Sequence, residues 1–117
     1  MRTLELEDLR KNPWNVMLQP LPKHPTRLLL ILAQVAATCC RQFAEEAMEE
    51  LKATYGDYEF QCDEFKAAVD DWWRAHRKIG EIIGLLEDRF GLRNVDFRLS
   101  RNVRRRRCFA RLMKFFD

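Results

Sequence analysis

Residues 58–90 have the sequence YEFQCDEFKAAVDDWWRAHRKIGEIIGLLEDRF. Apolar or aromatic side chains recur along this stretch at alternating intervals of four and three residues, interrupted once by a histidine. The recurring positions are Tyr58, Cys62, Phe65, Val69, Trp72, His76, Ile79, Ile83, Leu86 and Phe90. Such spacing predicts one long helix with an apolar seam along one side, ending at Gly91. Because one amphipathic helix cannot bury its own seam, another part of the chain or a partner must cover it.

A second long helix is expected over residues 26–55, between Pro25-Thr26 and Gly56. Residues 28–40 are apolar apart from Gln34 and Thr38. Since about 20 residues are needed to cross a bilayer, we interpret this half as a buried central helix. The second half is amphipathic and carries an acidic patch on its other side. The patch consists of Glu45, Glu46, Glu49 and Glu50.

The remaining segments are shorter. Thr3 is expected to cap a first helix that runs from Leu4 to about Lys11. Residues 12–25 are expected to form an irregular connector that tucks Trp14 and Leu18 into a groove. A final helix is expected over residues 101–116, after Ser100. These elements predict an all-α fold in a single domain, residues 1–117: a compact bundle of about four helices, with two long antiparallel helices and a basic C-terminal helix.

The charges of the chain are unevenly distributed. The net charge is +3, but residues 93–117 hold nine basic and two acidic residues and carry +7. The other 92 residues hold 12 basic and 16 acidic residues and carry −4. This asymmetry indicates either a polyanionic partner or pairing between the two regions.

The basic side chains of the predicted last helix form a stripe separate from its apolar face. The stripe consists of Arg101, Arg104, Arg107, Arg111 and Lys114, with Arg105 beside it. Its members span about 20 Å of helix, which suits contact with successive phosphates of a nucleic acid. Arginine is well suited to phosphate contact, because its planar guanidinium can bind a phosphate through two hydrogen bonds. The alternatives are a solvated face, a face neutralised by the acidic patch, or contact with an anionic membrane surface.

A second candidate site lies inside the long seam helix. Trp73 points off the seam and is followed by Arg74, Arg77 and Lys78, so its indole could stack an unpaired base beside cations. The alternative is a tryptophan that covers the edge of the bundle. His76 lies at the centre of the predicted seam, where a hydrogen-bonded core histidine or a residue that fixes oligomer register is expected.

No metal site, cofactor or catalytic centre is predicted. The cysteines at 39, 40, 62 and 108 have no zinc-binding spacing, and we expect them to be reduced and packed in the core of a cytoplasmic protein. The acidic pairs lack the Glu-x-x-His pattern of di-metal bundles. No activated nucleophile, phosphate loop or acid–base pair is recognisable, so the chain is not expected to be an enzyme.

Two hypotheses of function follow. The first is a non-catalytic subunit that binds the backbone of RNA or single-stranded DNA within a larger assembly. Small basic helical subunits that line CRISPR effector complexes are similar in size, class and charge, and the analogy extends no further. The second is a helical adaptor or oligomerisation module, whose seam and basic stripe bind a partner helix and an acidic partner.

Overall fold

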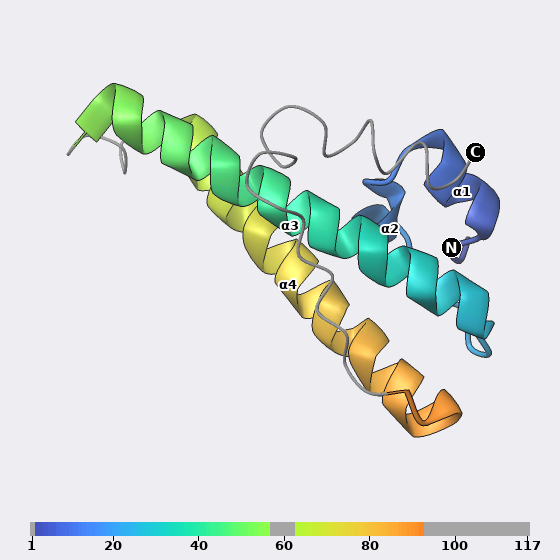
Figure 1. Ribbon diagram of the computed structural model, residues 1–117. Coiled ribbons are helices and arrows are strands. Elements are labelled where there is room, and N and C mark those ends of the chain that lie inside the picture. Colours follow the sequence, from blue (N-terminus) through green and yellow to red (C-terminus); the bar gives the residue numbers. More distant parts are fainter. Residues whose placement is uncertain (1, 57–62, 93–117) are drawn as a thin grey trace.

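The computed structural model describes residues 2–56 and 63–92, and within these ranges the regular structure is helical, without strands (Figure 1). Four helices follow one another: α1, Leu6–Lys11; α2, Asn15–Leu18; α3, Arg27–Tyr55; and α4, Asp63–Phe90. The predicted helical fold with two long helices is confirmed. The expected helix over residues 101–116, and any extension of α4 towards residue 58, lie outside the described residues.

Both long helices end where the sequence predicts. The Thr26 hydroxyl accepts a hydrogen bond of 3.1 Å from the backbone N–H of Leu29, which satisfies one of the free donors at the start of α3. Gly56 ends α3 with φ +58°, and Gly91 follows α4 with φ +64°. Only glycine adopts this left-handed region without a steric penalty, so the two glycines define both C-termini.

Removing the N-cap of α3 tests whether the Thr26 hydroxyl stabilises the start of this helix. Thr26→Ala is expected to lower the free energy of unfolding by about 0.5–2 kcal/mol, because the Leu29 N–H loses its acceptor. Thr54→Ala is the matched control, since the Thr54 hydroxyl only donates to the Glu50 carbonyl inside the exposed last turns of α3. Chemical denaturation would compare the two variants. Equal losses in both would contradict a capping role for Thr26.

The two long helices pack against each other over much of their length (Figure 1). On α4 the buried positions are Ala68, Ala75, Ile79, Ile82 and Leu86. Ile79 and Leu86 are buried as predicted. Elsewhere the seam is shifted by one residue: Ala75 and Ile82 are buried, whereas His76 is exposed and Ile83 is only partly buried.

The reason for this rotation lies on α3. Its buried face is rich in small side chains, which include Ala33, Ala36, Ala37 and Ala44. Small residues let two helix backbones approach closely, and Ala75 belongs to the same core cluster as the alanines at 33, 36 and 37. The periodicity of large apolar residues could not predict which face of α4 is buried. Alanine occurs on both buried and exposed helix faces, so it does not mark either one in such a pattern.

The N-terminal residues complete the core. Leu4, Leu9 and Val16 are fully buried against α3 and α4, and α2 contacts both long helices. Pro13 ends the first helix as expected, because the C-cap of α1 is Asn12. Residues 12–25 are not wholly irregular, since they include α2.

Two predictions for this region are wrong. Glu5, not Thr3, caps α1, and it does so in a capping box in which Asp8 accepts a 2.8 Å hydrogen bond from the Glu5 N–H. Leu18 is 66% exposed instead of lying in a groove, whereas Trp14 packs partly buried against the core.

Helix α3 is long and apolar enough to cross a membrane by length and composition, with a window of mean hydropathy 1.3. That window is 67% buried inside the protein. Such burial agrees with the interpretation of residues 28–40 as a central core helix.

Candidate nucleic-acid interface

The predicted interface divides between two parts of the chain. Six of its ten residues lie outside the described residues, and the structure places the other four on α4. The six are Arg101, Arg104, Arg105, Arg107, Arg111 and Lys114. The four are Trp73, Arg74, Arg77 and Lys78.

Trp73, Arg74 and Arg77 form one exposed surface, named here the α4 platform. The indole of Trp73 is 51% exposed, and both arginines are exposed beside it. The Nε of Arg77 donates to the Trp73 carbonyl at 3.4 Å, and the Arg74 guanidinium lies 3.6 Å from the Asp70 carboxylate. Pairs this exposed contribute little to stability, so both cations can exchange these partners for a phosphate.

The indole of Trp73 is held by neighbouring rings. It makes edge contacts with Trp72 at 4.9 Å and 85°, and with His76 at 5.9 Å and 89°. Trp72 and His76 are themselves stacked at 4.8 Å and 11°. Because perpendicular neighbours restrict the ring, Trp73 offers a preorganised aromatic surface at a small entropic cost.

The ring cluster is anchored to α3 by two polar contacts. The Trp72 Nε1–H donates to Glu45 Oε1 at 2.9 Å, and the Arg41 guanidinium lies 3.1 Å from His76 Nδ1. Arginine can only donate, so His76 Nδ1 is the acceptor of this contact. Neither Arg41 nor the contact of Glu45 with Trp72 was predicted, although Arg41 and Glu45 are separated by four residues on α3, as Trp72 and His76 are on α4.

His76 is hydrogen-bonded, as expected, but it is not in the core. It lies at the exposed edge of the helix pair, because Ala75 takes the buried seam position. Trp73 lies at the same edge, with 51% of its surface exposed.

Lys78 has a different environment from the other three. Its side chain is only 13% exposed, donates to the Gln19 carbonyl at 3.2 Å and lies 3.7 Å from the Glu81 carboxylate. These contacts tie the connector after α2 to α4. Of the four α4 residues, Lys78 therefore has the clearest structural role.

The predicted acidic patch on α3 is divided. Glu46 is buried and Glu45 bonds to Trp72, whereas Glu49 and Glu50 are exposed. The four carboxylates therefore do not form one solvent-facing surface that could neutralise a row of arginines.

The two adjacent cysteines of α3 differ in chemical state. Cys39 is disulfide-bonded, whereas Cys40 is a free and fully buried thiol. Burial, with a smaller contribution from the charge of Asp71, raises the pKa of the Cys40 thiol above its ordinary range. The prediction of reduced cysteines is thus wrong for Cys39.

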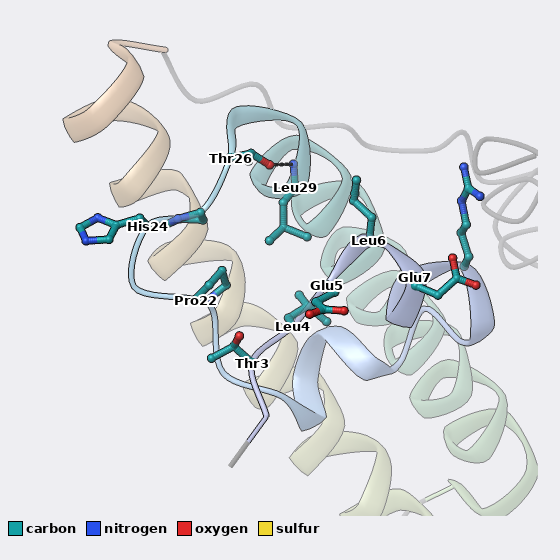
Figure 2. A pocket seen from close by; sticks show the side chains of 11 residues that line it. Thr3, Leu4, Glu5, Leu6, Glu7, Pro22, His24, Thr26 and Leu29 are labelled. Atoms are coloured by element: carbon teal, nitrogen blue, oxygen red, sulfur yellow. Dashed lines mark hydrogen bonds between the residues drawn. The ribbon is translucent and has the colours of Figure 1, made fainter.

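A shallow pocket lies elsewhere, between the N-terminal segment and the start of α3 (Figure 2). Leu4, Leu6 and Leu29 line it together with the titratable side chains of Glu5, Glu7 and His24. Across residues 2–56 and 63–92, no group of three or more His, Cys, Asp and Glu side chains is placed to hold a metal ion.

Comparison with models of known protein families, with curated protein sequences and with solved structures finds no match.

Proposed function

We propose that this protein is a non-catalytic subunit that binds the backbone of a nucleic acid, RNA or single-stranded DNA, within a larger protein assembly. The observation that carries the proposal is the charge of residues 93–117, where nine basic residues accompany two acidic ones. Neutralising phosphates with arginine and lysine releases condensed counterions, and this supplies most of the affinity of sequence-independent binding.

The α4 platform supports the proposal and adds a contact for bases. A half-exposed indole between two arginines combines an aromatic surface for stacking with cations for phosphate. Proteins that bind single strands without sequence preference use this combination. In the proposed arrangement, the two long helices are antiparallel in a compact bundle, and the basic C-terminal helix and the α4 platform contact one strand together.

Titration of the full-length protein with a fluorescent single-stranded RNA and a matched duplex DNA, at several salt concentrations, tests the proposal. Affinity is expected to fall steeply with salt, with a log–log slope of about −3 to −5 if most of the basic stripe binds phosphates. The ratio of RNA to DNA affinity would identify the ligand class. Binding that does not respond to salt, or no binding at low salt, would overturn the proposal.

The indole of Trp73 provides a separate prediction. Trp73→Ala is expected to weaken single-strand binding by about 1–3 kcal/mol, the usual value for one stacked base. The salt slope should stay unchanged, because no phosphate contact is lost. Trp73→Phe is the matched control and should retain most of the affinity. Full affinity in Trp73→Ala would exclude the α4 platform from the interface.

The adaptor hypothesis is the second candidate. Its main surface was the apolar seam of residues 58–90, but α3 covers the buried positions of α4. Among residues 2–56 and 63–92, the exposed large apolar side chains that a protein partner could contact include Leu18 and Leu28. A molar mass that rises with protein concentration, in the absence of nucleic acid binding, would favour this function.

A further inference from the structure

Both histidines of the chain accept a hydrogen bond from an arginine that belongs to a different element. Arg41 Nη1 on α3 lies 3.1 Å from His76 Nδ1 on α4, and Arg89 Nη1 on α4 lies 3.3 Å from His24 Nδ1 in the connector. Because arginine can only donate, the accepting Nδ1 carries no proton in either contact. Both contacts therefore require a neutral imidazole.

The His76 contact is part of the ring cluster that supports the α4 platform. Its imidazole is stacked on Trp72 at 4.8 Å and makes an edge contact with Trp73 at 5.9 Å. The position of one ring neighbour of Trp73 thus depends on the hydrogen bond with Arg41. His24 and Arg89, by contrast, form an exposed pair near the C-terminal end of α4.

The two partners of the His76 contact differ in their freedom to move. Arg41 is 8% exposed, whereas His76 is exposed at the edge of the helix pair. Protonation of Nδ1 would remove the acceptor and place a second cation beside the guanidinium. Turning the ring about its Cβ–Cγ bond does not relieve the repulsion, because the charge of an imidazolium is spread over the whole ring. The exposed partner, His76, is therefore the one that moves away.

The charged groups around His76 include one carboxylate on α3 that such a movement can approach. One turn along α3 from Arg41, Glu45 Oε1 accepts the indole N–H of Trp72 at 2.9 Å. A cationic His76 is attracted to this carboxylate and competes with Trp72 for it.

The other elements packed on α4 offer no stronger attraction. Helix α2 has no charged side chain, and α1 packs on α2 and α3 instead. Within five residues of His76 on α4, three side chains are basic and two are acidic, so an imidazolium gains no net attraction from them. These five are Asp71, Arg74, Arg77, Lys78 and Glu81.

We propose that His76 is a pH-sensitive latch for the α4 platform. The neutral imidazole holds the ring cluster through Arg41, and protonation of Nδ1 breaks this hydrogen bond and releases Trp72 and Trp73 from their fixed arrangement. Histidine is the side chain that ordinarily changes charge between about pH 5 and pH 8. The consequence for single-strand binding rests on the proposed function, whereas the release of the rings does not.

Nuclear magnetic resonance of the full-length protein between about pH 8 and pH 5.5 tests the latch. The indole N–H resonance of Trp72, assigned by its loss in Trp72→Phe, is expected to shift together with the ring C–H resonances of His76. The physical reason is that Glu45 changes its hydrogen-bond partner. A Trp72 resonance that stays fixed while His76 titrates would overturn the proposal.

Two histidine variants assign the effect to one ring. In His76→Gln the Trp72 resonance should not move with pH, since glutamine can accept from Arg41 but does not titrate in this range. His24→Gln is the matched control, because it removes the other histidine–arginine contact and should behave like the wild type. An equal shift in His76→Gln and wild type would also overturn the proposal. Circular dichroism would establish that both variants are folded.

Single-stranded RNA binding at the same two pH values measures the effect on the α4 platform. Trp73→Ala is expected to weaken binding roughly tenfold at pH 8 and by a clearly smaller factor at pH 5.5, because the released indole is less preorganised. This ratio cancels the general gain of positive charge at low pH. In a His76→Gln background the factor should be the same at both pH values.

The two kinds of measurement distinguish the latch from the proposed function. A pH-dependent Trp72 resonance in a protein that does not bind RNA would refute the proposed function alone. Salt-sensitive RNA binding by a protein whose Trp72 resonance ignores the titration of His76 would refute the latch alone.

Discussion

Replacing Ile82 by alanine is expected to lower the free energy of unfolding by about 2–5 kcal/mol. Ile82 is completely buried in the core that α4 shares with α3, so its truncation leaves a cavity. The loss is a large part of the stability of a domain of this size, which is roughly 5–15 kcal/mol. Chemical denaturation, followed by circular dichroism at 222 nm, would measure it.

Ile83→Ala is the matched control for this experiment. The two variants remove the same atoms from adjacent positions of one helix, so their helix propensities cancel. Ile83 is only partly buried, and its loss should therefore cost clearly less than that of Ile82. The periodicity of large residues predicts the opposite order. A greater loss for Ile83→Ala would mean that α4 is rotated relative to the structure described.

Changing Arg104, Arg107 and Arg111 together to glutamine is expected to reduce nucleic-acid affinity by roughly a hundredfold at 0.1 M salt. Each phosphate contact contributes about 0.7 to the salt slope on a single strand, so the slope should become shallower by about 2. Glutamine keeps polarity and helix propensity while it removes the charge. Fluorescence anisotropy with single-stranded RNA, at several salt concentrations, would determine both quantities.

A charge-matched control separates a specific surface from net charge. Arg10, Arg27 and Arg89 are exposed and lie outside the predicted interface. Changing these three to glutamine lowers the net charge by the same amount, yet most of the affinity and slope should remain. Equal losses in both triple variants would show that only overall charge matters, and the basic stripe would no longer be a defined contact surface.

The amino-acid sequence was sufficient for the two long helices, the start of α3 and both of their C-terminal ends. The alternation of four and three residues defined α4, the apolar run and Thr26 defined α3, and Gly56 and Gly91 marked both C-termini. These features depend on capping residues and on the spacing of apolar residues, and both can be identified in the sequence itself. The charge of residues 93–117 is likewise a property of sequence alone, and it carries the proposed function.

Only the tertiary structure decided which face of α4 is buried and what surrounds Trp73. The alanine-rich face of α3 draws Ala75 and Ile82 into the interface and leaves His76 at its edge, where Arg41 and Trp72 hold it. Close packing depends on the shapes of both partners at once, and a pattern read along one helix contains only half of that information.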